Sequence, residues 1–232
     1  MSVLVARDLV KTFRGGDGGV VSVLNGVNLS VARGEMIAVV GASGAGKSTL
    51  LHVIGALDRP DRGEVVIGGQ TLSNRSDDEL AAIRSRAVGF VFQFHHLLRE
   101  FSALENVMMP LRIAGRDPGP ARARALELIA RVGLSHRADH RPSELSGGEQ
   151  QRTAVARALA LDPAMFLADE PSGNLDHGNA EMLHDMLATL ARDLEIAMVV
   201  VTHNRSLARR ADRVLHLEDG VLQEADVQGV VG

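Results

Sequence analysis

A short glycine-rich loop constrains this chain more than any other feature of its sequence. Residues 41–48 read GASGAGKS and fit the pattern G-x-x-x-x-G-K-[ST]. The run Met36–Val40 before the loop is continuously apolar, which is typical of a parallel strand buried on both faces. A helix is expected to begin near Lys47. The order of strand, loop and helix predicts an α/β core built around a phosphate site.

The loop predicts a site for a nucleoside triphosphate. Glycines let successive backbone N–H groups turn toward phosphate oxygens, and the positive end of the following helix strengthens their effect. In this pattern Lys47 reaches the β- and γ-phosphates and Ser48 ligates Mg²⁺. The strand and helix on either side distinguish the motif from a chance glycine-rich turn.

Two adjacent carboxylates end a second apolar run. Residues 165–170 read MFLADE, so Asp169 and Glu170 stand at the carboxyl end of an expected strand, where sites form in α/β sheets. Asp169 is expected to hold Mg²⁺, and Glu170 to polarise the attacking water as general base. Alone this pair is a weak signal, because many strands end in solvated acidic turns. The phosphate loop favours the functional interpretation.

Patterns elsewhere predict one α/β domain with three parts. We expect an α/β core with a parallel sheet and an N-terminal antiparallel β layer in residues 1–93 and 161–232, and an α-helical subdomain in residues 94–160. Strands are expected at residues 3–5, 20–24, 27–31, 62–71, 88–92, 164–168 and 196–201. Helices are expected at residues 77–86, 104–113, 121–132, from 148 onward, and at 180–192.

Composition limits the partners of the chain. The 232 residues include no cysteine, which excludes disulfides, thiolate metal sites and a cysteine nucleophile and suits a reducing cytoplasm. The net charge of -4 offers no basic surface for nucleic acid, so no nucleic-acid partner is expected. The first residues lack a signal peptide and resemble a strand. Apolar runs fall short of the roughly 20 residues of a bilayer-spanning helix, so a membrane role requires a membrane-spanning partner.

A third motif makes the sequence similar to a known family. Residues 145–150 read LSGGEQ, and together with the two motifs above they resemble the ATP-hydrolysing subunits of ABC transporters over essentially the whole chain. Ser146, Gly147 and Gly148 also form a second helix start suited to an anion. The resemblance implies an ATPase that works as a homodimer, in which this second helix start faces ATP held by the other subunit.

The resemblance implies roles for further residues. Gln93 matches the residue that contacts Mg²⁺ and the attacking water, and His203 matches the histidine that contacts the γ-phosphate. Asp176 matches a residue that communicates across the dimer, and Phe13 stands where the family stacks an aromatic ring on adenine. Without the order of motifs, Gln93 and His203 would be read as ordinary polar surface.

The expected sites are therefore as follows. The catalytic residues are Lys47, Gln93, Glu170 and His203, and the Mg²⁺ ligands are Ser48, Gln93 and Asp169. The residues expected to bind ATP are Phe13, Gly41, Ala42, Ser43, Gly44, Ala45, Gly46, Lys47, Ser48, Thr49, Ser146, Gly147, Gly148 and Asp176.

One segment resembles the lipoprotein-releasing branch of the family. Residues 92–110 read FQFHHLLREFSALENVMMP, and this segment is where the family contacts its membrane subunits. Two such subunits are expected to dock near residues 94–110, from Phe94 to Pro110, on an apolar groove. The side chains expected to face outward there are Phe94, Leu97, Leu98, Phe101 and Met108. The resemblance implies release of lipoproteins to a periplasmic carrier, by a subunit held at the cytoplasmic face of the inner membrane.

Two alternative functions keep the ATPase. The segment EPSGNLD fits both the lipoprotein-releasing branch and the macrolide-export ATPases, so it does not separate them. The segments HHLL and EFSALEN argue against the ATPase of a macrolide-export complex and against that of a cell-division complex. A soluble ABC ATPase acting on DNA or ribosomes would carry a coiled-coil insertion or two cassettes, and a non-hydrolysing switch would lack Glu170. His136 and His140 have the spacing of two metal ligands, but no third ligand accompanies them, so a solvated helix end is favoured.

Overall fold

The computed structural model describes residues 2–16 and 18–225. The strands are β1 Ser2–Arg14, β2 Val20–Ala32, β3 Met36–Val40, β4 Arg62–Ile67, β5 Gln70–Thr71, β6 Val88–Val91, β7 Met165–Asp169, β8 Ala197–Val201, β9 Arg213–Glu218 and β10 Val221–Glu224. The helices are α1 Lys47–Ile54, α2 Asp77–Ala87, α3 Ala103–Ile113, α4 Pro118–Arg131, α5 Gly147–Ala158, α6 His177–Asp193 and α7 Arg205–Ala208, with short 3-10 helices η1 Ser135–Arg137 and η2 Pro142–Glu144. The predicted helices and buried strands are confirmed to within three residues at their ends.

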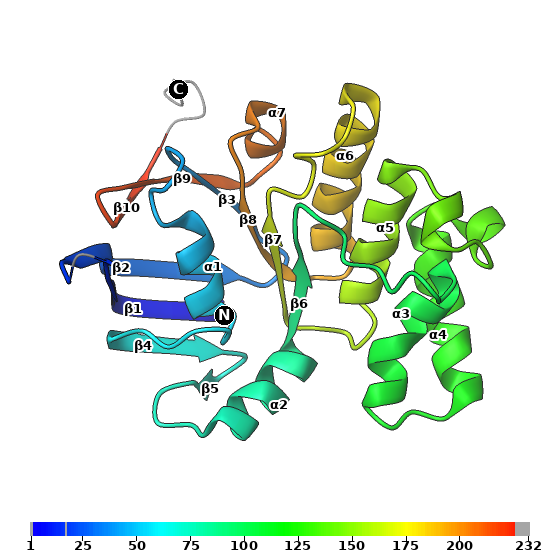
Figure 1. Ribbon diagram of the computed structural model, residues 1–232, viewed down its shortest axis with the longest axis horizontal. Coiled ribbons are helices and arrows are strands. Elements are labelled where there is room, and N and C mark those ends of the chain that lie inside the picture. Colours follow the sequence, from blue (N-terminus) through cyan, green and yellow to red (C-terminus); the bar gives the residue numbers. More distant parts are fainter. Residues whose placement is uncertain (1, 17, 226–232) are drawn as a thin grey trace.

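Two sheets make up the β structure. The antiparallel sheet has the order β2-β1-β4-β5, and the second sheet has the order β10-β9-β3-β8-β7-β6. In the second sheet β10 is antiparallel to β9, and the other neighbouring pairs are parallel. Figure 1 shows the antiparallel sheet and the helices α3 and α4 on opposite sides of the molecule. This confirms the expected α/β class with an antiparallel β layer.

Buried strands divide their side chains between two apolar clusters. Along β7, Met165 and Leu167 join the cluster that contains α1 and the antiparallel sheet, whereas Phe166 and Ala168 join the cluster that contains α3–α6. This alternation follows from the two-residue period of a strand. Because both faces of β7 are covered, its carboxyl end is held firmly in place, and this end carries Asp169 and Glu170.

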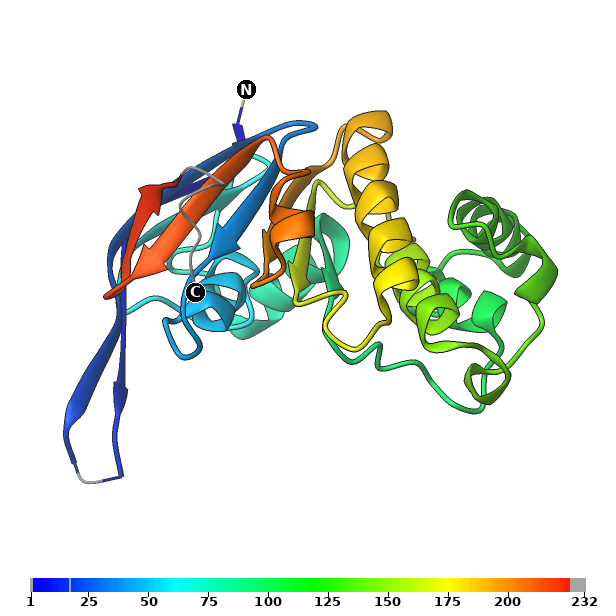
Figure 2. The same ribbon diagram turned by 90° about the horizontal axis from the view of Figure 1, so that it is seen from above.

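The helices α3, α4 and α5 lie between β6 and β7 in the sequence. Their buried residues belong to the same cluster as those of α6, so these helices pack on one another and on one face of the sheet. Figure 2 shows them at the end of the molecule away from the β1–β2 hairpin. None of the helices within the described residues has the length and apolar character that a bilayer crossing requires.

The N-terminal hairpin differs from the expectation of several short strands. β1 and β2 are each 13 residues long, and the predicted segments 20–24 and 27–31 lie in one strand. Gly26 adopts a φ of 83°, and the register shifts between Ala6 and Leu9, so a bulge absorbs the irregular residues. The Asn28 side chain accepts a hydrogen bond from the Asp8 backbone N–H, so this N–H has a partner although it lies in the bulge. Strand β2 therefore continues through Gly26, where the sequence pattern predicts a break between two strands.

Candidate functional site

The phosphate loop connects the end of β3 to the start of α1. The N-cap of α1 is Gly46, with a φ of 98°, and within the described residues no side chain caps this helix. A Cβ atom at Gly41 would lie 2.4 Å from the Leu217 carbonyl oxygen, so β9 leaves room there only for glycine. The backbone N–H groups at the start of α1 are thus left to face a ligand, which suits an anion.

Lys47 lies across this loop. Its Nζ donates hydrogen bonds to the carbonyl oxygens of Gly41 and Ala42, both at 2.9 Å. The half-buried side chain is thereby held over the loop, with its positive charge beside the N-terminus of α1. A positive charge at this point favours phosphate groups within the loop.

A cavity of about 570 Å³ brings most of the expected site residues together. It is lined by Phe13, Val23, Ser43, Gly44, Gly46, Lys47, Ser48, Thr49, Phe92, Gln93, Phe94, His96, Asp169 and Glu170. Gly41, Ala42 and Ala45 belong to the same loop but not to this lining. The cavity lies within the size range of small-molecule sites, roughly 300–1,000 Å³. The loop and the two carboxylates therefore share one pocket, although more than 115 residues separate them in the chain.

Glu170 is held by three groups of the loop that follows β8. Its Oε1 accepts a hydrogen bond from the His203 backbone N–H at 3.0 Å and lies 2.8 Å from His203 Nδ1. Its Oε2 accepts from the Thr202 hydroxyl at 3.2 Å. Glu170 has a φ of 45°, and its side chain is 19% exposed, whereas that of His203 is 75% exposed. This arrangement makes Glu170 an oriented carboxylate next to an imidazole.

Oxygen donors suited to Mg²⁺ converge on the cavity. Ser48, Gln93 and Asp169 all line it, and their hydroxyl, amide and carboxylate oxygens are the hard ligands that Mg²⁺ prefers. Gln93 Nε2 donates to Asn174 Oδ1 at 3.0 Å, and Asn174 Nδ2 donates to the Gln93 carbonyl at 3.2 Å. Asn174 therefore tethers Gln93 to the loop after β7, a link that the sequence patterns did not reveal.

Phe13 lies at the edge of the cavity on β1. It pairs with Val21 of β2, and its side chain is 45% exposed. The Nζ of Lys11 lies 5.3 Å from the centre of the ring. An exposed ring at the edge of the cavity can stack on a planar group.

The second helix start lies outside this cavity. Ser146 is the N-cap of α5: its hydroxyl accepts from the Glu149 N–H, and Glu149 Oε2 accepts from the Ser146 N–H at 2.8 Å. Ser146 and Gly147 are exposed, whereas Gly148 is buried. A Cβ at Gly148 would lie 2.3 Å from the Asn179 side-chain oxygen, so α5 abuts the first turn of α6. One chain does not bring this helix start to its own phosphate loop.

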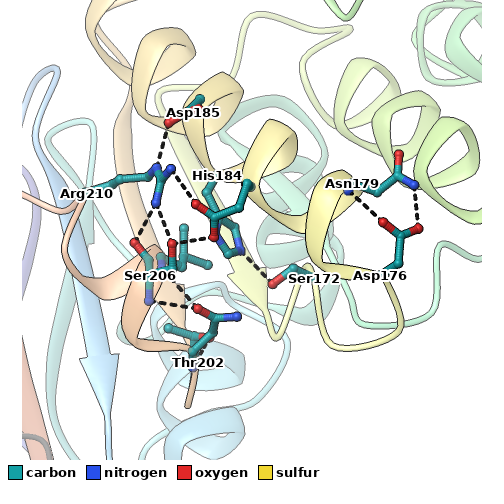
Figure 3. Close-up of polar contacts among 11 residues, drawn as sticks. Ser172, Asp176, Asn179, His184, Asp185, Thr202, Ser206 and Arg210 are labelled. Atoms are coloured by element: carbon teal, nitrogen blue, oxygen red, sulfur yellow. Dashed lines mark hydrogen bonds and ion pairs between the residues drawn. The ribbon is translucent and has the colours of Figure 1, made fainter.

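Asp176 is also outside the cavity, at the start of α6. Its carboxylate accepts hydrogen bonds from the Asn179 backbone N–H at 3.0 Å and from Asn179 Nδ2 at 2.6 Å (Figure 3). The bond from the Asn179 backbone lowers the pKa of the Asp176 carboxyl below its ordinary value. Asp176 therefore remains charged near neutral pH beside the exposed start of α5.

The segment after β6 forms a second groove, of about 990 Å³. It is lined by Phe94, His95, His96, Leu97, Arg99, Glu100, Arg141, Pro142, Ser143 and Gln150. The buried Asn106 fixes the segment: its Nδ2 donates to the carbonyls of Leu98, Phe101 and Ser102, and its Oδ1 accepts from the Leu98 N–H. This segment is held in shape by α3.

The structure corrects part of the expected apolar surface. Phe94, Leu98 and Phe101 are exposed as expected. Leu97 is only 7% exposed, so its expected outward orientation is wrong. Met108 is half-buried and packs against the cluster of α3–α6.

His136 and His140 lie near η1, apart from the cavity. His136 is exposed, and His140 Nε2 lies 3.1 Å from an Arg137 guanidinium nitrogen. No group of three or more potential metal-binding His, Cys, Asp or Glu residues occurs within residues 2–16 and 18–225. This is consistent with reading the pair as surface histidines.

One histidine that the sequence patterns did not single out is buried next to the site. His184 on α6 has no exposed area, and its Nε2 lies 2.7 Å from the hydroxyl of Ser172, two residues after Glu170 (Figure 3). Burial lowers the pKa of His184 below its ordinary value of 6.5, and the negative charge of Glu181 only partly opposes this. His184 is therefore neutral at neutral pH.

The neutral state of His184 predicts a loss of stability in acid. Below pH 6.5 the unfolded chain binds a proton at this position while the folded chain does not, so stability present above pH 6.5 is lost as the pH falls. We expect the free energy of unfolding of His184→Leu to depend less on pH than that of the unmodified chain, by up to about 1.4 kcal/mol per pH unit. Denaturant unfolding at pH 7.5 and 5.5 measures this difference.

The exposed His136 provides the control for this prediction. His136→Gln removes an imidazole without disturbing a buried contact, so its stability should follow the same pH dependence as the unmodified chain. Equal pH dependence in His184→Leu and the unmodified chain would contradict a neutral buried His184.

Comparisons with known proteins find relatives over nearly the whole chain. The family model described as ABC transporter matches residues 24–173. The chain is 54% identical over 96% of its length to "Lipoprotein-releasing system ATP-binding protein LolD" of Xanthomonas campestris, covering 93% of that protein. It is 54% identical over 94% of its length to the LolD of Geobacter metallireducens, covering 97% of that protein.

Solved structures extend the similarity to the fold. The dimeric ATP-binding cassette MJ0796, in a post-hydrolysis state bound to ADP and Pi, is 39% identical with a TM-score of 0.86. The alignment covers 97% of this chain and 99% of the cassette. A second dimeric structure of MJ0796, described as a bacterial ABC transporter cassette, is 40% identical with the same TM-score and coverage.

Proposed function

The chain belongs to the ABC transporter family, and from this membership we propose that it is the ATP-hydrolysing subunit of a complex that releases lipoproteins from the inner membrane. The observation that supports catalysis is that a single cavity contains the phosphate loop, Asp169 and Glu170. The observation that supports lipoprotein release is about 54% identity to LolD proteins over nearly the full chain. The bond broken is the anhydride between the β- and γ-phosphates of ATP.

The residues of the site have distinct parts in this reaction. The phosphate loop and Lys47 bind the triphosphate, and Phe13 stacks on the base. Glu170 accepts the proton of the attacking water, while its contacts with Thr202 and His203 fix the direction of its carboxylate. His203 lies at the same oxygen of Glu170 and contacts the γ-phosphate. The high exposure of His203 leaves it accessible to that phosphate.

Mg²⁺ is the cofactor that the oxygen donors of the cavity fit. Ser48, Gln93 and Asp169 would hold it. When bound, Mg²⁺ would neutralise the negative charge that develops on the phosphates during hydrolysis.

A homodimer completes the site in this proposal. The start of α5 lies outside the cavity of its own chain, with Ser146 and Gly147 exposed and Gly148 buried behind them. A helix start of this kind suits an anion, so it is available to the triphosphate bound by a second copy. Asp176 lies against the same helix start through Asn179, which places it at the proposed interface. The related cassette MJ0796 is dimeric.

Two membrane subunits would dock on the groove near residues 94–110. Phe94 lines this groove together with the charged side chains of Arg99, Glu100 and Arg141. Leu98 and Phe101 lie in the same segment and are also exposed. Such docking would hold the chain at the cytoplasmic face of the inner membrane. The groove begins one residue after Gln93, so a partner in the groove can sense the state of the nucleotide site.

Co-purification from native membranes tests this function. A tagged chain is expected to recover two lipoprotein-releasing membrane subunits, and replacement of both Phe94 and Leu98 by Ser is expected to lose most of them. Leu126→Ser provides the control, because Leu126 is also exposed but lies on α4, outside the segment of residues 94–110. Recovery of a macrolide-export or cell-division permease would identify the alternative function instead.

A further inference from the structure

A series of buried polar contacts begins at Ser172, two residues after Glu170. Ser172 is 6% exposed and its hydroxyl contacts His184 Nε2, while His184 Nδ1 lies 3.6 Å from Glu181 Oε1. The negative charge of Glu181 favours the proton on Nδ1 of the neutral ring. Nε2 is then the acceptor, and the Ser172 hydroxyl donates to it. The turn after Glu170 is therefore attached to helix α6.

Helix α6 is in turn attached to α7, the helix that follows His203. The Ser206 hydroxyl donates to Glu181 Oε1, and Arg210 donates to Glu181 Oε2 at 2.9 Å and to the Ser206 carbonyl at 2.9 Å. Arg210 Nε also donates to Asp185 at 2.7 Å (Figure 3). Hydrogen bonding from Ser206, followed by that from Arg210, lowers the pKa of Glu181, so it is ionised at neutral pH. An ionised carboxylate forms stronger hydrogen bonds than a neutral acceptor.

From Ser206, further contacts lead through Asn204 and Thr202 to the carboxylate of Glu170. The Ser206 backbone N–H donates to Asn204 Oδ1 at 2.8 Å, and the Asn204 N–H donates to the Thr202 hydroxyl at 2.9 Å. That hydroxyl donates to Glu170 Oε2. The contacts thus form a closed ring that starts and ends at Glu170 and passes through α6 and α7.

We propose that this ring, with His184 and Ser206 at its centre, is a positioning device that sets the carboxylate of Glu170 and the imidazole of His203 for hydrolysis. Ser172, His184, Glu181 and Ser206 lie outside the nucleotide cavity, so they act through Glu170 and His203. Glu170 lies on the loop after β7, and His203 on the loop after β8. The direct contacts of Glu170 with Thr202 and His203 join these two loops, and the ring adds a second connection between them through α6 and α7.

Geometry supports a role beyond packing. A fully buried imidazole is unfavourable in an apolar core, and leucine would fill the same space on α6. His184 instead spans the distance between the loop after β7 and a charged cluster on α6 and α7. A buried hydrogen bond fixes the arrangement of the two groups it joins, and His184 Nε2 forms such a bond with Ser172. The inference rests on the proposed roles of Glu170 and His203 in ATP hydrolysis.

Steady-state kinetics of the full-length chain test the ring at two separate links. In Ser172→Ala and in Ser206→Ala we expect kcat for ATP to fall about tenfold while KM changes less than about twofold, because binding groups are untouched. Ser172→Thr keeps a hydroxyl at the first link and is expected to retain at least half of kcat. The variant combining Ser172→Ala with His184→Leu should be no slower than Ser172→Ala alone, because both remove the same link.

The controls separate this inference from a loss of folding and from the proposed function. Thr189→Ala removes an exposed hydroxyl of α6 that bonds only along its own helix to Asp185, and it should leave kcat unchanged. Unchanged kcat in both Ser172→Ala and Ser206→Ala, or an equal fall in Thr189→Ala, would overturn the inference. Glu170→Gln is measured in parallel, and hydrolysis that survives there would overturn the proposed function itself.

Discussion

Replacement of Glu170 by glutamine is expected to lower the steady-state rate of ATP hydrolysis by about 10²- to 10⁴-fold, which is the range of a lost general base. The amide keeps an oxygen that can accept from the His203 N–H and the Thr202 hydroxyl, so the local structure should persist. ATP binding does not require the carboxylate. The variant should therefore accumulate as an ATP-bound dimer, which phosphate release and size-exclusion chromatography with ATP measure together.

A surface glutamate provides the matched control. Glu218→Gln makes the same chemical change on β9 at a side chain that is 75% exposed, and it should hydrolyse ATP at the normal rate. A rate in Glu170→Gln within tenfold of the unmodified chain would show that another group accepts the proton. A variant that neither hydrolyses nor binds ATP would show that Glu170 acts on the structure of the cavity.

Replacement of Lys47 by alanine is expected to remove ATP binding rather than the chemical step alone. Its ammonium group lies within 2.9 Å of the carbonyls of Gly41 and Ala42, at the point where the loop would receive the β- and γ-phosphates. In the bound state Lys47 would instead donate to phosphate oxygens. Hydrogen bonds to charged groups are each worth about 1.5–3 kcal/mol, so the loss of two bonds to phosphate corresponds to roughly a hundredfold or more in affinity for ATP. Isothermal titration with ATP measures the loss directly.

The stability of the Lys47 variant distinguishes a lost ligand contact from a damaged loop. The two carbonyls can turn to water, so the denaturant midpoint should change little. Arg33→Ala removes a positive charge that is 65% exposed and pairs with Glu195, away from the cavity lining, and it should bind ATP normally. Tight ATP binding by Lys47→Ala, or an equal loss in Arg33→Ala, would contradict the assignment.

Much of the core could be predicted, because the patterns that indicate its strands and helices involve residues that are close together in the sequence. The apolar run Met36–Val40 and the glycines after it define a strand and a phosphate loop within about a dozen residues. Ser76 and Ser102 each stand three residues before a glutamate, and both pairs form capping boxes that begin α2 and α3. Local chemistry of this kind does not depend on the rest of the fold.

Other elements could not be read from such local signals. The hairpin of β9 and β10 was not predicted, because its strands have mixed polarity and the pattern offers no continuous apolar run. The merging of two expected strands into β2 depends on pairing with β1 across the bulge at Gly26. Leu97 and Leu98 are identical in type, and only the contacts of Asn106 with the segment decide which of them is buried.

The α/β class, the phosphate loop, the carboxylate pair and the family follow from residue type and spacing alone. The contact of Glu170 with His203, 33 residues away, and the contact of His184 with the turn after Glu170 emerge only when the chain is folded. Side-chain contacts over such a distance depend on how strands and helices pack. No pattern of neighbouring residues carries that information.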